Sequence, residues 1–232
     1  MRAIFLVSLW AVLCASPAAA VVIGVSGSAV NAGSASGVDL SEGGTENASI
    51  QAFTERQDVD VAANALTVDF LTGPGGNLVV GNTISGLSNS AGTPFLLPEG
   101  VYSSHIIVYD PVDQSGRQTV ENGSVRFDGE IVAIVTSNVG SSGGASDRRL
   151  DNSDVLGNAS SYDNGDGRRL EGPDSITLSA IDTITINLLR VGGSNIDHFR
   201  VITREFSDVP LPASIIGLLA GLGLLSMQRR RN

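Results

Sequence analysis

The sequence predicts an all-β fold, namely a single antiparallel β-sandwich of jelly-roll-like type. Two observations predict it. Glycine is abundant, with 28 of 232 residues, and aromatic residues make up only 5%. Short runs that alternate apolar and polar residues recur between Gly-rich turns, whereas the body of the chain lacks the periodicity of amphipathic helices. Many short strands joined by such turns are typical of a sandwich or a jelly roll.

The expected strands are runs with period-two alternation or continuous apolar runs that stop at turn residues. They are 66–71, 78–80, 101–109, 125–128, 131–135, 176–178, 181–189 and 196–203. The 131–135 run is apolar throughout, which indicates burial on both faces. The 181–189 and 196–203 strands flank a Gly-rich turn, so we expect them to pair as an antiparallel hairpin.

Four segments divide the chain. We expect a signal peptide over 1–20, a low-complexity segment with one edge strand over 21–48, the β-sandwich domain over 49–207, and a sorting signal with one transmembrane helix over 208–232. Within the domain, 147–173 is rich in Asp, Asn and Gly, shows no periodicity, and is expected to be a long surface loop.

The amino-terminal segment has the three parts of a secretory signal. Met1-Arg2 is a short basic region, 3–15 is apolar, and small residues follow at Ala18 and Ala20. Signal peptidase needs small residues at these two positions, so cleavage is expected after Ala20. The single cysteine of the chain, Cys14, would be removed with the signal, which excludes disulfides from the mature body.

The carboxyl-terminal segment also has three ordered parts. A proline-bearing motif comes first, made of Val209, Pro210, Leu211, Pro212 and Ala213. The uncharged segment 209–227 is near the lower limit of the roughly 17–25 residues that cross a bilayer. A stop-transfer cluster follows, made of Arg229, Arg230 and Arg231. The positive-inside rule places that cluster in the cytoplasm and the body outside it.

This motif, the apolar segment and the arginine cluster resemble the VPLPA variant of the PEP-CTERM sorting signals of Gram-negative bacteria. The resemblance implies an exosortase-type transpeptidase that cuts at the motif and transfers the body to an acceptor. The expected partners are therefore signal peptidase, the exosortase, the membrane and an exopolysaccharide. Four stretches of the body, 52–55, 103–111, 153–157 and 196–203, also resemble the bodies of such exported proteins.

The charge of the body excludes one class of partner. Four of the 14 basic residues lie in the two terminal segments, which leaves ten arginines against 24 acidic residues, a net charge of −14. Nucleic acids require the opposite sign, so no nucleic-acid partner is expected. An acidic surface suits an extracellular protein and is compatible with divalent cations.

Calcium is the chemical hypothesis that the sequence favours most. Asp163, Asn164 and Asp166 offer hard oxygen ligands on a Gly-rich stretch, and calcium binds six to eight such oxygens. The spacing differs from an EF-hand, because Tyr162 stands where its first aspartate would be and Pro173 where its glutamate would be. The alternative is a solvated turn-forming loop. No other cofactor is expected.

Catalytic sites find less support. His105 follows Ser103 and Ser104, but no Gly-x-Ser-x-Gly elbow surrounds either serine. Candidate carboxylates for glycoside hydrolysis are Glu55, Glu130, Glu171 and Glu205. We therefore expect an exported, membrane-anchored and then processed surface or matrix protein that is not an enzyme. The alternative is a secreted carbohydrate-binding module or adhesin, either with or without a requirement for calcium.

Overall fold

The computed structural model describes residues 20–40, 44–45, 47–63, 65–85, 95–110, 119–136, 156–157, 161–162, 174–190 and 197–206. Within these ranges every regular element is a strand. The strands are β1 (Val22–Gly27), β2 (Ala29–Ser34), β3 (Asp39–Leu40), β4 (Ile50–Val61), β5 (Thr67–Val68), β6 (Phe70–Leu71), β7 (Thr83–Ser85), β8 (Phe95–Leu96), β9 (Gly100–Tyr109), β10 (Thr119–Phe127), β11 (Glu130–Val135), β12 (Ser161–Tyr162), β13 (Ser175–Ala180), β14 (Thr183–Arg190) and β15 (Asp197–Arg204).

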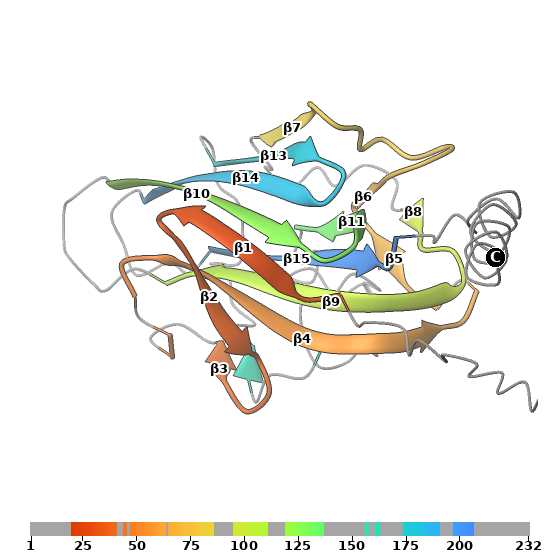
Figure 1. Ribbon diagram of the computed structural model, residues 1–232, viewed down its shortest axis with the longest axis horizontal. Coiled ribbons are helices and arrows are strands. Elements are labelled where there is room, and N and C mark those ends of the chain that lie inside the picture. Colours follow the sequence, from red (N-terminus) through yellow and green to blue (C-terminus); the bar gives the residue numbers. More distant parts are fainter. Residues whose placement is uncertain are drawn as a thin grey trace, which may run out of the picture.

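Two large sheets form a β-sandwich-like structure, as the sequence predicts (Figure 1). The five-stranded sheet has the order β1-β10-β14-β13-β7, and the six-stranded sheet has the order β2-β4-β9-β15-β11-β6. All pairs within them are antiparallel except β2 with β4, which is parallel. The small pairs β5-β8 and β3-β12 complete the described structure.

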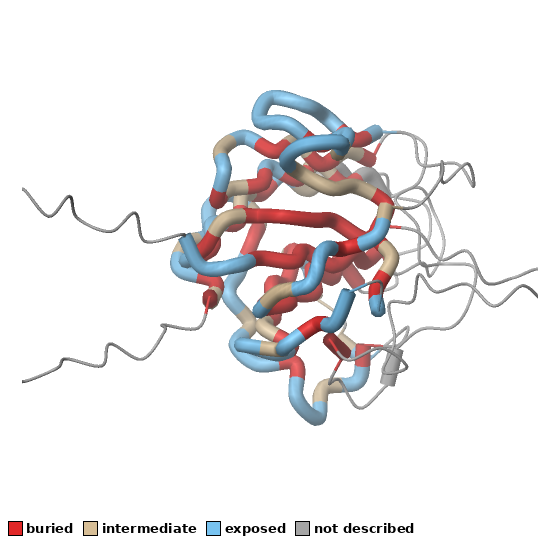
Figure 2. Tube along the Cα trace, turned by 90° about the vertical axis from the view of Figure 1, so that its right-hand side faces the viewer, coloured by how far each residue is buried: buried red, intermediate tan, exposed pale blue. Residues whose placement is uncertain are grey.

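The six-stranded sheet is buried on both faces. One face packs against the five-stranded sheet and forms the inner core, with Ile107 of β9 and Phe199 of β15 among its members. The opposite face carries the outer core, which includes Ile106 and Ile202 and is covered by residues outside the large sheets such as Leu156. Figure 2 shows the resulting block of buried backbone. Neighbours on one strand point to opposite faces, so a continuous apolar run suits such a strand.

Most expected strands are confirmed. The 101–109 run is β9, and the 131–135 run is β11, whose side chains from Ile131 to Val135 are all buried, as its unbroken apolar character predicts. The 125–128 run is the end of the longer β10, and 176–178 is the centre of β13.

The predicted hairpin between 181–189 and 196–203 is wrong. β14 pairs with β10 and β13 in the five-stranded sheet, whereas β15 pairs with β9 and β11 in the six-stranded sheet. The chain therefore crosses from one sheet to the other between them. β15 is buried over seven of its eight residues, and only a central strand of a doubly covered sheet offers that burial.

Two further strand predictions need correction. The 66–71 run is divided at Asp69, because β5 pairs with β8 while β6 pairs with β11. Asp69 accepts a hydrogen bond from the Thr136 amide at 2.9 Å, which holds the chain at the division. The 78–80 run begins no strand: Asn82 donates to the Val79 carbonyl in a turn, and Val79 and Val80 are exposed. The next strand is β7.

The segment 21–48 contributes more than the single edge strand expected. It supplies β1 at the edge of the five-stranded sheet and β2 at the edge of the six-stranded sheet. The chain crosses between the sheets at Gly27, whose φ of 67° lies in the left-handed region that favours glycine. A side chain at Gly27 would also meet the Asn122 carbonyl.

Both ends of the described body meet at Gly129. A Cβ built on this glycine would lie 2.7 Å from the Arg204 carbonyl oxygen and 3.0 Å from the Ala20 Cβ. The Asp128 amide donates to the Val21 carbonyl at 2.8 Å, which fixes the first described residues beside β10. We call this end of the sandwich the Gly129 end, and the opposite end, where β9 stops before Asp110, the Asp110 end.

Gly129→Ala is expected to destabilise the fold, because the new methyl group would meet backbone that cannot move aside. Overpacking of this kind costs about 1–3 kcal/mol. Chemical denaturation of the variant measures the loss. Gly33→Ala is a weaker control for packing, because nothing lies within 4 Å of a Cβ there and only its φ of 82° is unfavourable. A Gly129→Ala variant as stable as the unmodified protein would contradict the close approach.

Candidate functional site

A buried ion pair is the strongest polar feature of the described structure. Arg200 of β15 donates from Nε to Glu55 Oε2 at 2.6 Å and from Nη2 to Glu55 Oε1 at 3.0 Å. The exposed fractions of the two side chains are 1% and 0%. Two parallel hydrogen bonds between a guanidinium and a carboxylate are the strongest geometry for such a pair. The pair lies on the outer face of the six-stranded sheet, since Arg200 alternates with the inner-core residues Phe199 and Val201.

Glu55 lies at a β-bulge in β4. Thr54 pairs with His105 and Arg56 pairs with Ser104, so Glu55 is an extra residue without its own partner position on β9. Thr54 faces the inner core, where its hydroxyl is 3.3 Å from His105 Nδ1. Glu55 instead lies beside Ser104, an outer-face residue. Regular alternation after the inward-facing Thr54 already directs Glu55 to the outer face, and the bulge changes the pairing register of the residues from Arg56 on.

Residues 156–157 cover this ion pair. The Ser104 hydroxyl is 2.8 Å from the Leu156 carbonyl and 3.2 Å from Glu55 Oε2, so its one hydrogen can serve either acceptor. Arg56 Nε donates to the Gly157 carbonyl at 2.9 Å. Leu156 is fully buried in the outer core. Arg56 of β4 and Ser104 of β9 thus bind the consecutive backbone carbonyls of Gly157 and Leu156 beside the charged pair.

Ser104→Ala tests this covering contact. The change removes the Ser104 hydroxyl that contacts the Leu156 carbonyl and Glu55, and a hydrogen bond of this kind contributes about 0.5–1.5 kcal/mol. We expect a loss of that size in urea denaturation and faster proteolysis near 156–157. Ser175→Ala, a change of the same type at a partly exposed position, is the control. Unchanged stability would show that the Ser104 hydroxyl contributes nothing to this contact.

His105 is fully buried and held by two threonines. Its Nε2 is 3.0 Å from Thr203 Oγ1 and its Nδ1 is 3.3 Å from Thr54 Oγ1, while its ring lies 4.7 Å from the Phe127 ring. Burial lowers the pKa of His105 to about 3. The ring is therefore neutral near pH 7, and its nitrogens are occupied by hydroxyls of the structure. This is the arrangement of a structural histidine.

The catalytic alternatives do not assemble among the described residues. Ser104 and His105 lie on opposite faces of β9. Glu55 and Glu130 lie on β4 and β11, three strands apart, and strands about 4.8 Å apart place their backbones roughly 14 Å from each other. Each carboxylate is also paired with an arginine, Glu130 with Arg204 at 2.8 Å. Glu205 is exposed after β15, and Glu171 lies outside the described residues.

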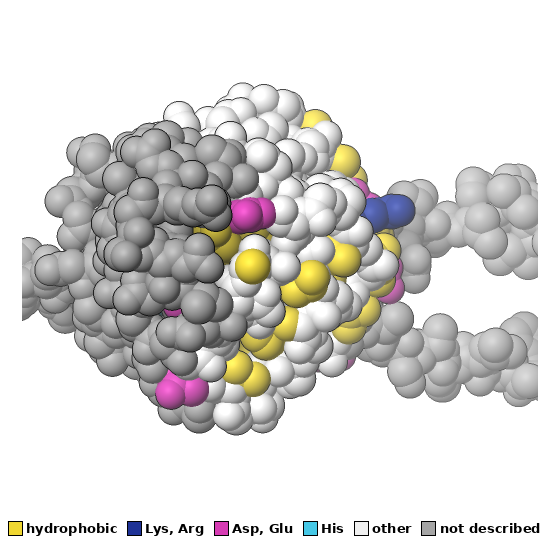
Figure 3. Space-filling model, turned by 90° about the vertical axis from the view of Figure 1, so that its left-hand side faces the viewer, with side chains coloured by type: hydrophobic (Ala, Val, Ile, Leu, Met, Phe, Trp, Pro, Cys, Tyr) yellow, Lys and Arg dark blue, Asp and Glu magenta, His cyan; other side chains and the backbone are white. Residues whose placement is uncertain are grey.

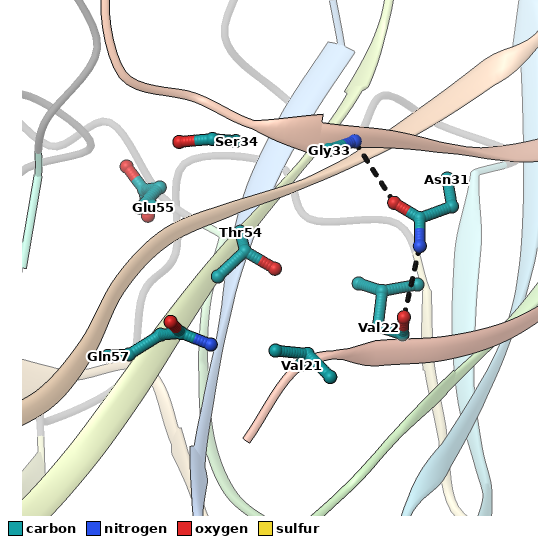
Figure 4. A pocket seen from close by; sticks show the side chains of 8 residues that line it. All are labelled: Val21, Val22, Asn31, Gly33, Ser34, Thr54, Glu55 and Gln57. Atoms are coloured by element: carbon teal, nitrogen blue, oxygen red, sulfur yellow. Dashed lines mark hydrogen bonds between the residues drawn. The ribbon is translucent and has the colours of Figure 1, made fainter. Parts of the chain in front are cut away.

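A groove opens at the edge of the sandwich where β1 and β2 separate (Figure 4). Its volume is about 340 Å³, and it is lined by Val21, Val22, Asn31, Gly33, Ser34, Thr54, Glu55 and Gln57. Asn31 closes its inner side: Nδ2 donates to the Val22 carbonyl at 3.0 Å, and Oδ1 accepts from the Gly33 amide at 3.0 Å. Gln57 Nε2 is 3.4 Å from the Ala20 carbonyl. The lining has hydroxyl and amide groups and no aromatic ring.

The site residues expected from the sequence lie mainly outside this region. Ala18, the motif 209–213, the cluster 229–231 and the calcium candidates 163, 164 and 166 fall outside the described residues. Ala20 is described and buried. Within the described ranges, no group of three or more His, Asp, Glu or Cys side chains is placed to hold a metal ion. Those ranges also contain no helix with the length and apolarity of a membrane span.

Comparison with protein-family models, curated proteins and solved structures finds no match to this chain.

Sequence reasoning missed the ion pair and the groove. The sequence indicates Glu55 as a candidate catalytic acid and Arg200 as part of a strand, but it does not indicate that the two side chains meet. Polar residues inside an apolar strand pattern, such as Arg200 within 196–203, were the available signal. A buried arginine needs a buried acid, but the sequence does not indicate which acid supplies it.

Proposed function

We propose that this protein is an exported surface or extracellular-matrix protein without catalytic activity. A signal peptide over 1–20 directs export, and the apolar segment 209–227 holds the body at the inner membrane. An exosortase-type transpeptidase then cuts within 209–213 and transfers the body, a jelly-roll-like sandwich, to the cell surface or the matrix. The observation that carries the proposal is the ordered series of motif, apolar segment and arginine cluster over 208–232.

The body is consistent with this role. A doubly covered sheet with a fully buried ion pair is a rigid, water-excluding scaffold, which suits a protein outside the cell that lacks disulfides. The polar residues with the tightest contacts, His105 and Glu55, are engaged by partners of the structure. These two buried groups thus contribute to the stability of the body.

Mass spectrometry of the mature protein from its native cell tests the proposal. We expect a mass that lacks residues 1–20 and every residue beyond the cut within 209–213. A population in which Arg229, Arg230 and Arg231 all remain would contradict the processing. A Pro210→Ala, Pro212→Ala double variant is expected to accumulate at the membrane uncut, because the motif loses its extended geometry.

A carbohydrate-binding module or adhesin is the second candidate, and the groove beside Asn31 favours it. Hydroxyl and amide side chains, which line this groove, are suitable partners for sugar hydroxyls. A glycan array with and without a chelator tests it. Binding that is lost in Asn31→Ala would support it, and binding lost with the chelator would add calcium at 163–166. The absence of binding to any glycan would contradict it.

A further inference from the structure

The two ends of the described body leave the sandwich side by side. Gly129 lies between them, in contact distance of both the Arg204 carbonyl and Ala20. β1 and β9 begin at this end, and β4 and β15 finish there, as the pairing of Val22 with Phe127 and of Val61 with Gly100 shows. Residues 1–19 and 207–232 are therefore attached to neighbouring points on the Gly129 end.

The connection to the apolar segment is short. Phe206 is the last described residue of the body, and the uncharged segment begins at Val209. If the motif 209–213 also lies outside the lipid, the seven residues from Ser207 to Ala213 span at most about 25 Å. A body anchored through 209–227 therefore cannot stand far from the bilayer surface, whatever its orientation.

The Gly129 end presents apolar side chains at the ends of its strands. Val101 at the start of β9 is 55% exposed, Ile181 in the β13–β14 turn is 49% exposed, and Phe206 is 45% exposed. Apolar side chains are also visible on the opposite end (Figure 3), so exposed apolar area alone does not choose between the two ends. The short connection between Phe206 and the apolar segment indicates that the Gly129 end is the one that faces the membrane.

The two arginines described at the Gly129 end, Arg126 and Arg204, are paired, whereas the carboxylates at this end include the exposed Asp60, Glu99, Asp128 and Glu205. Arg126 donates to Asp182 at 2.8 Å, and Arg204 donates to Glu130 at 2.8 Å. These paired arginines give little attraction to anionic headgroups, and the apolar residues suit the boundary between headgroups and acyl chains. Contact with the bilayer at this end is thus expected on zwitterionic lipid, and the exposed carboxylates oppose contact with anionic lipid.

We infer that the anchored protein stands end-on, with Val101, Ile181 and Phe206 against the lipid surface and the Asp110 end turned away from it. This inference rests on the proposed membrane anchoring. β9 has ten residues and spans roughly 33 Å at about 3.3 Å per residue. The Asp110 end is consequently the part of the described body that is held farthest from the membrane.

Single cysteines measure this orientation. In a full-length chain carrying Cys14→Ser, a cysteine replaces Glu205 or Val101 at the Gly129 end, or Ala48 at the Asp110 end, and carries an environment-sensitive fluorophore. All three positions are exposed, and Ala48 is next to Asn47, whose amide donates to the Asp110 carbonyl. The protein is reconstituted in phosphatidylcholine vesicles that contain a headgroup-labelled nitroxide lipid. Equal denaturation midpoints verify that the variants are folded.

We expect the nitroxide lipid to quench more than half of the fluorescence at positions 205 and 101 and to leave position 48 unquenched. Equal quenching at the two ends, in protein that floats with the vesicles, would overturn the end-on orientation while leaving the anchoring intact. Stronger quenching at position 48 would overturn it in the same way. Protein that does not float with the vesicles would overturn the proposed anchoring and, with it, this inference.

Discussion

Glu55→Gln is expected to lower the free energy of unfolding by about 3–5 kcal/mol, the cost of leaving one partner of a buried ion pair uncompensated. Glutamine has nearly the shape of glutamate, so the change creates almost no cavity and isolates the charge. Arg200 would keep its charge at an exposed fraction of 1% and would lose the Glu55 carboxylate that binds its Nε and Nη2. Urea denaturation with a constant slope measures the loss.

The control is Glu130→Gln, which removes the same charge from another glutamate paired with an arginine of β15. Glu130 is 22% exposed and Arg204 is 49% exposed, so water screens this pair. Exposed pairs contribute about 1 kcal/mol or less. Similar losses in the two variants would contradict the view that burial makes the Glu55 pair important.

A double replacement measures the interaction between the two side chains apart from their interactions with other residues. Glu55→Met with Arg200→Met removes both charges, and buried pairs replaced by apolar residues are often as stable as before. We expect the double variant to be more stable than Glu55→Gln, with a coupling free energy of about 2 kcal/mol between the two positions. Additive losses would mean that the two side chains do not interact in solution.

The sequence predicted those strands whose existence and burial follow from the local order of apolar and polar residues. The 101–109 and 131–135 runs are strongly apolar and stop at turn residues, so their existence as strands needs no knowledge of partners. Burial on both faces of β11 followed from its unbroken apolar character. The all-β class followed in the same way from many such runs separated by glycine.

Pairing could not be predicted, because it depends on contacts far apart in sequence. The Gly-rich turn before Asp197 looked like a hairpin turn, yet β15 is inserted between β9 and β11. The reason lies in its composition: Phe199 and Val201 need one buried face, and Arg200 needs a buried acid on the other. Glu55 supplies that acid from 145 positions away, and no local pattern of the sequence indicates this pairing.

His105 is expected to make the protein less stable as the pH falls below about 6.5. Its pKa is about 3 in the folded protein against 6.5 for an ordinary histidine. Between these values the unfolded chain binds a proton at this position and the folded protein does not. The contribution of His105 to the free energy of unfolding is therefore fully present above pH 6.5 and falls as the pH is lowered. The loss is up to about 1.4 kcal/mol per pH unit and reaches about 4–5 kcal/mol by pH 3.

His105→Gln isolates this contribution, because every carboxylate is shared by the two proteins. Glutamine keeps a donor and an acceptor between Thr54 and Thr203 but cannot be protonated. The variant is expected to be less stable at pH 7, where the packing against Phe127 is lost, and to lose less stability between pH 6 and pH 4. Urea denaturation at a series of pH values gives the two profiles. Parallel profiles would mean that the imidazole is protonated equally in the folded and unfolded states, which a ring enclosed by Thr54, Thr203 and Phe127 does not permit.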